Sequence, residues 1–197
     1  MLKLNEVKKL YRKKSALNRV NLTIKKGNLY LFIGENGSGK STTIKLIAKI
    51  IFNNKNEGLI INEFDKIVYM ADKRSYPPLL KVKTFLSIYL NVKENNSKID
   101  EWLKKYNLEN KRIIELSKGM KQKVGIIQTL LTEGDLYLFD EPIDGLDKES
   151  IEIFKADLKE MLNFGKTIVI SSHNKIIFRE LKPITYKFDS GYCNEKK

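Results

Sequence analysis

A glycine-rich stretch at residues 34–42, GENGSGKST, constrains the fold more than any other part of the chain. It follows an apolar run at residues 29–33 and precedes a segment with the apolar spacing of a helix. Glycines, lysine and serine at these offsets form a phosphate-binding loop when a buried strand precedes them and a helix follows. The sequence therefore predicts such a loop, whereas the alternative, a glycine-rich turn without a ligand, would not need this strand and helix.

The residue types in this loop suit a triphosphate. Gly34, Gly37 and Gly39 can adopt backbone angles that other residues avoid, so successive N–H groups can surround phosphate oxygens. The helix that follows points the positive end of its dipole at the same anion. Lys40 would reach the β- and γ-phosphates, and the Ser41 hydroxyl would bind Mg²⁺. The residues of the loop expected to bind the nucleotide are Asn36, Gly37, Ser38, Gly39, Lys40, Ser41 and Thr42.

The length of 197 residues is sufficient for one α/β domain with a substantial core and too short for two in tandem. We therefore expect a single domain over residues 1–197. No apolar run has signal-peptide character at the N-terminus or the length that crosses a bilayer, so we expect a protein that is soluble by itself. The single cysteine, Cys193, suits a reducing cytoplasm.

The formal net charge of +13 admits three explanations. A basic surface attracts nucleic acids, but the lysines are spread along the whole chain and no aromatic and basic RNA-binding motif is present. Anionic lipid headgroups would explain the charge equally well, and so would a compositional bias toward Lys, Asn and Ile that has no function. We expect no specific nucleic-acid partner, and the choice among the explanations stays open.

Hydrophobic patterning divides much of the chain into strands and a helical insert. Apolar runs bounded by turn residues predict strands, and apolar residues at helical spacing predict helices. Pro77 and Pro78 force an extended path before the first helix of the insert. The expected strands are residues 2–11, 20–24, 58–61 and 66–70, and the insert, about residues 72–132, contains helices at 82–90, 99–106 and 116–131.

Tyr11 stands at the end of the first expected strand. An exposed aromatic ring at that point could stack on an adenine ring. Its position fits packing in the core or at an edge as well, so the residue alone does not decide between these interpretations.

The helix expected from residue 116 begins with an unusual charge pattern. Ser117 is a good N-cap, but Lys118, Lys121 and Lys123 lie where the helix dipole prefers acidic residues. Such a helix end suits an incoming polyanion. The alternative is a poorly optimised surface helix.

The run at residues 136–139 is apolar on both faces, as in a central parallel strand, and it is followed by Asp140 and Glu141. Ligands of parallel sheets lie at the carboxyl ends of the strands, so both acids are expected near the phosphate loop. Asp140 would contact Mg²⁺ directly or through one of its ligands. Glu141 could orient and deprotonate a water aimed at the γ-phosphate. The alternative is an acid pair that only caps a turn.

His173, the only histidine, follows another apolar strand, expected at residues 167–170. Its position at the carboxyl end of a strand predicts a contact with the γ-phosphate, although a lone histidine is more often structural. A helix is expected at residues 148–164, and residues 174–197 predict a short helix and a terminal strand.

Together these motifs resemble the nucleotide-binding subunit of an ABC transporter over essentially the whole chain. Residues 34–42 are similar to its Walker A loop, and residues 136–141 to its Walker B strand with the catalytic glutamate. Residues 116–120 resemble its signature motif, residues 142–147 its D-loop, and His173 its switch histidine.

The resemblance implies a P-loop NTPase with a mostly parallel central sheet, an N-terminal antiparallel β element and a helical insert. It implies that the chain binds ATP and Mg²⁺ and hydrolyses ATP between two copies arranged head to tail. Tyr11 would stack on adenine, and Ser117 and Gly119 would contact the γ-phosphate across the interface. The resemblance implies catalytic roles for Lys40, Glu141 and His173, and it also places Asp147 at the nucleotide.

Two positions depart from the family pattern. The family usually has glutamine in the loop after the strand that ends at Met70, whereas this chain has Asp72, whose carboxylate could still bind Mg²⁺. The signature reads Ser-Lys-Gly-Met instead of Ser-Gly-Gly-Gln, a variant similar to those of bacitracin-resistance and lantibiotic-immunity exporters. Residues 76–79 and the helix at 82–90 are similar to their insert, which implies export of drugs or antimicrobial peptides.

The resemblance implies two partners, a second copy of the chain and an integral membrane permease contacted through residues 72–90. It implies a cytoplasmic location, peripheral on the inner face of the cell membrane. A soluble ABC ATPase of translation or DNA repair is an alternative, but such proteins have paired domains or long coiled coils that 197 residues cannot hold. Another alternative is a module that senses nucleotide without hydrolysing it, but the presence of both Asp140 and Glu141 disfavours this alternative. A P-loop kinase or GTPase fits less well, because no Asn-Lys-x-Asp element is present.

Overall fold

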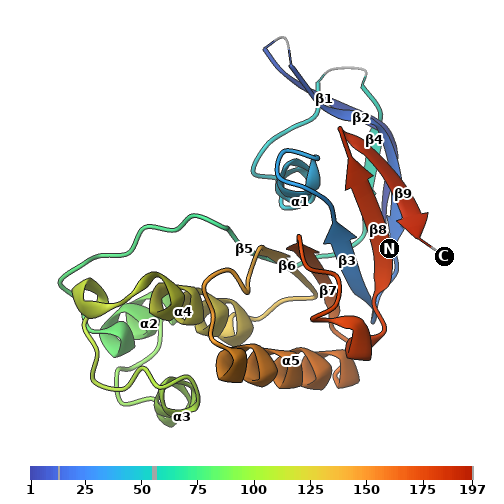
Figure 1. Cartoon of the computed structure of the whole chain (residues 1–197). Helices are drawn as coiled ribbons and strands as arrows, with labels where there is room; N and C mark the ends of the chain where they lie inside the picture. The colour runs from blue at the N-terminus through green and yellow to red at the C-terminus, as the bar shows by residue number, and fades with distance from the viewer. Residues whose placement is uncertain (13, 55–56, 197) are drawn as a thin grey trace.

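The computed structural model describes residues 1–12, 14–54 and 57–196 as two sheets and several helices (Figure 1). Within these ranges the smaller sheet is antiparallel, with the strand order β2-β1-β4. Its strands are β1 (Leu2–Tyr11), β2 (Lys14–Ile24) and β4 (Leu59–Asn62). The predicted N-terminal antiparallel element is therefore confirmed, and β2 is longer than the strand expected at residues 20–24.

The larger sheet has the strand order β5-β6-β7-β3-β8-β9 in the described residues. Every neighbouring pair is parallel except the last, in which β9 runs antiparallel to β8. The strands are β5 (Ile67–Met70), β6 (Leu136–Asp140), β7 (Thr167–Ser172), β3 (Leu29–Ile33), β8 (Ile184–Asp189) and β9 (Tyr192–Lys196). The mostly parallel central sheet is confirmed.

The C-terminal region contains the expected short helix but two strands instead of the single strand that was expected. After the 3-10 helix η2 (Arg179–Leu181), β8 and β9 form a hairpin. Its turn contains Ser190 and Gly191, with φ of 48° and 84°. The N–H of Gly191 donates to the carbonyl oxygen of Ser38 at 3.0 Å, so this hairpin contacts the phosphate loop.

The central strands carry apolar side chains on both faces because both faces are covered. On β3, Leu31 and Ile33 join the core that includes helix α5 (Lys148–Asn163), whereas Tyr30 and Phe32 join the core shared with the smaller sheet. Every residue of β3, β6 and β7 is buried. Continuous apolar runs therefore predicted these strands correctly.

The helical insert follows β5 and lies within the expected range, about residues 72–132. Figure 1 shows its green helices at the end of the molecule opposite the smaller sheet. Its helices are α2 (Val82–Leu90), α3 (Ser97–Lys105), the 3-10 helix η1 (Ile113–Glu115) and α4 (Lys118–Leu131). Helix α4 contacts β5 and so joins the insert to the sheet. Among the described residues, no helix is both long and apolar enough to cross a membrane.

Three neighbouring parallel strands, β3, β6 and β7, end at the same edge of the larger sheet. The phosphate loop and helix α1 (Lys40–Ile47) follow β3. Polar residues end or follow β6 and β7. The sheet therefore brings together side chains that are about 100 to 130 positions apart in the chain, and this edge holds the candidate site.

Candidate active site

The phosphate loop connects β3 to α1 and leaves the N-terminus of α1 open. Gly37 and Gly39 have φ of 80° and 112°, in the region that favours glycine. No side chain of the described residues caps α1, so the N–H groups of its first turn remain available. This geometry suits the binding of a phosphate.

Ser38 and Gly34 add to the shape of the loop. A Cβ at Gly34 would lie 2.3 Å from the carbonyl oxygen of Phe188, so a larger residue does not fit there. The Ser38 hydroxyl is buried and has no hydrogen-bond partner among the described residues. Buried polar atoms almost always have a partner, so this hydroxyl is suited to a bound anion.

Lys40 is nearly buried, with 5% of its surface exposed. Its Nζ donates to the carbonyl oxygens of Gly34 at 2.6 Å and Glu35 at 3.1 Å. It also lies 3.5 Å from Glu141 Oε1. These three oxygens compensate the buried charge and hold the ammonium group beside the loop.

Ser41 and Asp140 meet at the same edge of the sheet. Ser41 Oγ donates to Asp140 Oδ1 at 2.8 Å, and Ser171 Oγ donates to the same oxygen at 2.7 Å. The described residues hold no cluster of three or more His, Cys, Asp or Glu that could bind a metal ion. Mg²⁺ is often held by one or two carboxylates together with waters and substrate phosphates, so this donor set fits an ion that arrives with a nucleotide.

The Glu141 carboxylate lies between a lysine and a histidine. Its Oε1 faces Lys40, and its Oε2 lies 3.3 Å from His173 Nδ1. The backbone of Glu141 has a φ of 48°, which costs roughly 1–2 kcal/mol for a residue with a Cβ. Two hydrogen bonds hold it: its N–H donates to Ser171 Oγ at 2.9 Å, and its carbonyl accepts from Gln122 Nε2 at 2.8 Å. The structure thus brings the three predicted catalytic residues together.

The N-terminus of α4 is exposed, in contrast to the phosphate loop. Ser117 Oγ accepts a hydrogen bond from the N–H of Met120 at 3.2 Å, which confirms the predicted N-cap. A Cβ at Gly119 would lie 2.3 Å from the carbonyl oxygen of Gly145. The helix and the turn after β6 therefore approach this closely only because position 119 is glycine.

Two of the three lysines near this helix end are paired within the chain. Lys118 Nζ lies 2.5 Å from Asp144 Oδ2, and Lys123 Nζ lies 3.1 Å from Asp147 Oδ2. Lys121 is exposed. The sequence pattern overstated the free positive charge here, because acidic residues of the turn after β6 neutralise much of it.

Asp147 has a structural role in the single chain. Its Oδ1 accepts hydrogen bonds from the N–H of Ser150 at 2.8 Å and from Ser150 Oγ at 2.7 Å, which caps α5. The hydrogen bonds from Ser150, together with the Lys123 ammonium, hold the pKa of Asp147 far below its usual range. Its contact with the nucleotide stays a prediction.

Tyr11 and Asp72 lie on the surface. Tyr11 is 46% exposed, which excludes core packing, and Lys9 Nζ lies 5.5 Å from the centroid of its ring. Asp72 is exposed in the loop after β5. In the described part of the chain, no hydrogen bond joins either residue to the cluster around Lys40. Their contacts with adenine and Mg²⁺ therefore stay predictions.

The sequence did not single out three residues that support the site. Ser171 links Asp140 to the backbone of Glu141, Gln122 reaches Glu141 from α4, and Gly191 contacts Ser38. Ser171 stands two positions before His173 at a strand end, which is a usable signal. Gln122 and Gly191 have no local signal, because their contacts depend on the packing of distant segments.

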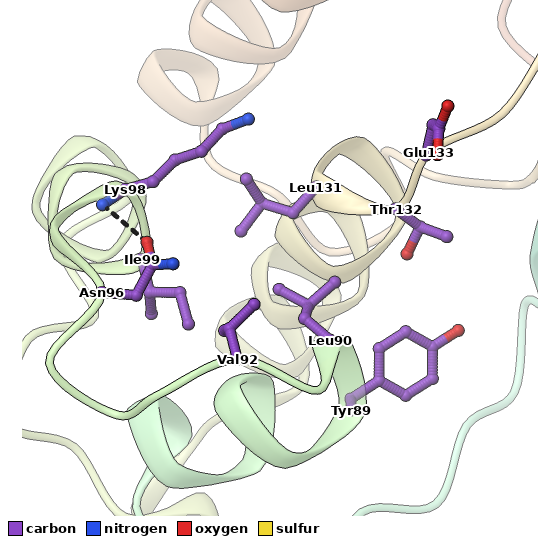
Figure 2. A pocket seen from close by; sticks show the side chains of 9 residues that line it. All are labelled: Tyr89, Leu90, Val92, Asn96, Lys98, Ile99, Leu131, Thr132 and Glu133. Carbon is purple, nitrogen blue, oxygen red and sulfur yellow. Dashed lines mark hydrogen bonds between the residues drawn. The ribbon is translucent and has the colours of Figure 1, made fainter.

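A separate cavity of about 440 Å³ lies in the helical insert, between the ends of α2, α3 and α4 (Figure 2). Figure 2 shows Leu90, Val92 and Leu131 in its lining, with Lys98 and Glu133 on opposite sides of the view. None of its lining residues belongs to the predicted nucleotide site. The cavity is therefore not part of the candidate active site.

The site and the fold define a class. A phosphate loop joins the central parallel strand β3 to helix α1. Asp140, at the end of β6, contacts the Ser41 hydroxyl, and β7 lies between β6 and β3 in the sheet. This combination is that of a P-loop nucleoside triphosphatase.

Comparison with known proteins narrows the class to a family. Residues 17–144 match the family model described as ABC transporter. The lantibiotic transport ATP-binding protein SrtF of Streptococcus pyogenes is 36% identical over 191 residues, which cover 88% of this chain and 80% of SrtF. The chain belongs to the ABC transporter family and is an ATPase of that family.

Solved structures agree with this assignment. The dimeric structure of MJ0796, a bacterial ABC transporter cassette, matches with a TM-score of 0.87 and 26% identity, covering 100% of this chain and 98% of that one. A post-hydrolysis state of the same cassette, bound to ADP and Pi, matches with a TM-score of 0.86 and 26% identity over the same shares of the two chains. The predicted P-loop fold is thereby confirmed.

Proposed function

We propose that residues 1–197 form a single ATP-binding domain that hydrolyses ATP to power a membrane permease. The observation that carries this proposal is the cluster at the phosphate loop, where the Glu141 carboxylate lies within 3.5 Å of Lys40 Nζ and 3.3 Å of His173 Nδ1. Both distances are short enough for these groups to act on one phosphoryl group.

The cluster suits hydrolysis of the γ-phosphate. Glu141 can take a proton from an attacking water. Lys40 can stabilise the negative charge on the phosphoryl oxygens in the transition state. His173, beside the same carboxylate, can hold the γ-phosphate in place. Because Lys40 and Asp140 are nearly buried, charges here interact more strongly than they would in water.

We propose that Ser41 and Asp140 hold Mg²⁺, and that Asp72 adds a carboxylate from the loop after β5. When bound, the ion neutralises charge on the phosphates. The shared hydrogen bond of 2.8 Å between Ser41 and Asp140 supports the pair, since two oxygens this close can contact one ion. For Asp72, the family pattern and its exposed position after β5 are the support. If Asp72→Ala leaves the Mg²⁺ dependence of hydrolysis unchanged, its role is excluded.

We propose that a second copy completes the site. Ser117 and the N-terminus of α4 are exposed, although this helix end is capped and two of its three lysines are paired with carboxylates. Ser117 and Gly119 would contact the γ-phosphate of ATP bound to the other copy. The dimeric structure of MJ0796 supports this arrangement.

We propose that residues 72–90 contact the permease, with the ATPase peripheral on the cytoplasmic face of the membrane. Exposed apolar side chains support this contact: Leu79 is 78% exposed, Ile88 67% and Tyr89 50%. The cargo would be drugs or antimicrobial peptides, which the similarity to SrtF, a lantibiotic transport ATP-binding protein, supports. The polytopic protein that co-purifies from detergent-solubilised membranes would identify the permease, and its absence would favour a soluble ABC ATPase.

Glu141→Gln tests the proposed chemistry. The amide keeps the size of the side chain but cannot take a proton, so phosphate release should fall by about 10²- to 10⁴-fold while ATP still binds. The variant should then accumulate as a dimer with ATP and Mg²⁺ in gel filtration. A variant that stays monomeric at saturating ATP and Mg²⁺ would contradict the scheme.

The same phosphate-release assay separates an enzyme from a nucleotide sensor. The wild-type chain should release phosphate continuously, whereas a sensor would bind ATP and release none. Glu149→Gln is a matched control, because Glu149 is an exposed acid on the first turn of α5. It should leave the rate unchanged.

A further inference from the structure

A chain of hydrogen bonds connects the loop after β5 to the backbone of Glu141. In this loop, Arg74 Nη1 donates to the carbonyl oxygen of Ala71 at 2.5 Å. Arg74 Nη2 donates to Gln122 Oε1 at 2.5 Å, and Gln122 Nε2 donates to the carbonyl oxygen of Glu141 at 2.8 Å. Two side chains therefore bridge a loop of the insert and the proposed catalytic acid.

Gln122 can make this bridge in only one orientation. A guanidinium group has only donors and a backbone carbonyl has only acceptors, so the amide oxygen must face Arg74 and the amide nitrogen must face Glu141. Gln122 is 5% exposed, and leaving either end of the amide unpaired there would be costly. The position of Arg74 and the position of the Glu141 carbonyl are thus coupled through one buried side chain.

Gly125 makes room for the arginine. It lies three residues after Gln122 on α4, so the two positions are neighbours on one face of the helix. A Cβ at Gly125 would lie 2.5 Å from Arg74 Cζ and 2.6 Å from Arg74 Nε. The guanidinium therefore lies against the helix at a point where even a methyl group would displace it.

The bridge ends at a backbone that needs support. Glu141 has a φ of 48°, and its carboxylate is directed to Lys40 and His173. Its N–H is held by Ser171, and its carbonyl by Gln122. A backbone in this sparsely populated region persists only when its surroundings hold it there.

We propose that Arg74 and Gln122 are positioning residues, which hold Glu141 in the geometry for hydrolysis and connect it to the loop after β5. In this chain, the loop is therefore connected to the backbone of Glu141 through Arg74 and not through the exposed Asp72. The inference rests on the proposed function in one respect, namely that Glu141 takes the proton from water. It adds that loss of the Arg74 contact lowers the rate of hydrolysis.

A positioning role predicts a specific kinetic pattern. The phosphate loop binds ATP through its own backbone and Lys40, which the bridge does not touch. Loss of Arg74 should therefore lower kcat and leave KM for ATP unchanged. Since misplacement of a reacting group by about 1 Å can cost 10²-fold, we expect a decrease in kcat of tenfold or more, on the order of 10- to 100-fold.

The test uses the full chain in steady-state phosphate-release assays with ATP and Mg²⁺. The variants are Arg74→Ala, Gly125→Ala and the double variant. Arg74→Ala and Gly125→Ala should each lower kcat, and the double variant should be no worse than Arg74→Ala, because both changes break the same bridge. Alanine also stabilises helix interiors relative to glycine, so Gly125→Ala should raise the Tm when Arg74 is absent.

Lys93→Ala is the matched control, because Lys93 is an exposed lysine of the insert outside residues 72–90 and should not affect kcat. Arg74→Ala in the Glu141→Gln background tests folding: this double variant should still form the ATP-dependent dimer. Failure to dimerise, or a rise in KM with kcat unchanged, would overturn the positioning role. Additive losses in Arg74→Ala and Gly125→Ala would do the same.

Two reference proteins in the same assay separate this inference from the proposed function. An inactive wild type, or full activity of Glu141→Gln, overturns both. If the wild type is active, Glu141→Gln is inactive and Arg74→Ala equals the wild type, only the bridge is excluded.

Discussion

The phosphate-loop edge of the sheet and the N-terminus of α4 are both polar, but they are built in opposite ways. At the loop, Lys40 and Asp140 are 5% and 1% exposed, and each has partners from other elements. At α4, Ser117 is exposed, and among the described residues its hydroxyl bonds only within its own helix. The first region is organised by contacts within one chain, whereas the second presents an exposed helix end, which we propose contacts ATP bound to another copy.

The difference follows from the cost of burying polar groups. A buried cation or carboxylate must be paired in the folded chain, and this pairing fixes its position before a ligand arrives. An exposed helix end needs no such partner, because water satisfies it until a ligand does. The comparison therefore supports the proposal that the loop sets the geometry of hydrolysis and that α4 supplies contacts on association.

The largest expected effect comes from changing both regions, the phosphate loop and the N-terminus of α4, and measuring the loss of ATP hydrolysis. Lys40→Ala should abolish hydrolysis by removing the loop's cation, and Ser117→Glu should abolish it by placing a carboxylate against the γ-phosphate. Mixed together, the two inactive variants should regain activity. In a mixed dimer, the intact loop of one copy faces the intact α4 of the other.

Phosphate release from the mixture, compared with each variant alone, measures this effect. Ser117→Thr is the control, because threonine keeps both the hydroxyl and the N-cap. A mixture that stays inactive would mean that the loop and α4 of the same chain act together, which contradicts the head-to-tail arrangement.

A smaller effect is expected at Tyr11. Its ring is exposed, as Ser117 at α4 is, but it is predicted to stack on the adenine of ATP bound at the phosphate loop. Stacking of an aromatic ring on a base contributes about 1–3 kcal/mol, so Tyr11→Ala should raise the Kd for ATP about tenfold. Tyr11→Phe should keep the affinity, because the ring remains. Equilibrium binding of a fluorescent ATP analogue would measure both, and equal affinity for all three proteins would leave Tyr11 without a role.

The smallest effect concerns Asp147, which joins α4 to α5 through Lys123 and Ser150. Asp147→Ala removes an N-cap and should lower the free energy of unfolding by about 1 kcal/mol. Asp147→Ser keeps a capping oxygen and should lose less. Urea unfolding at pH 7 measures both, and equal losses in the two variants would show that the cap is not the cause.

This contribution should depend on pH in a defined direction. The pKa of Asp147 is lowered in the folded chain, first by the hydrogen bonds from Ser150, below its ordinary value of 3.8. Its stabilising effect is therefore present above pH 3.8 and is lost as the pH falls toward the folded-state pKa. The difference between the wild type and Asp147→Ala should shrink in acid, and a difference that grows there would contradict the assignment.

Much of the site could be predicted because its parts are local. Residues 34–42 contain the loop's glycines, Lys40 and Ser41 in one stretch, and the strand and helix patterns on either side are strong. Asp140, Glu141 and His173 could be placed beside them because parallel strands end at one edge of a sheet. The N-cap role of Ser117 needed only its own helix.

Other features depended on contacts between distant segments. The pairing of Lys118 with Asp144 makes this helix end less cationic than the sequence pattern indicated, and no pattern near residue 118 indicates that partner. The hairpin of β8 and β9 replaced the single expected strand. Its turn at Ser190-Gly191 contacts Ser38, a contact that no local sequence pattern indicates.

The sequence by itself determined the phosphate loop, the order of strands and helices up to β7, and the identity of the acids at the sheet edge, since each is a property of neighbouring residues. Only the tertiary structure decided how Glu141 is held: Gln122, itself bonded to Arg74, donates to its carbonyl oxygen, and Ser171 accepts from its N–H. Those contacts join residues 19 to 48 positions apart, and hydrogen bonding at such separations depends on how the helices pack on the sheet.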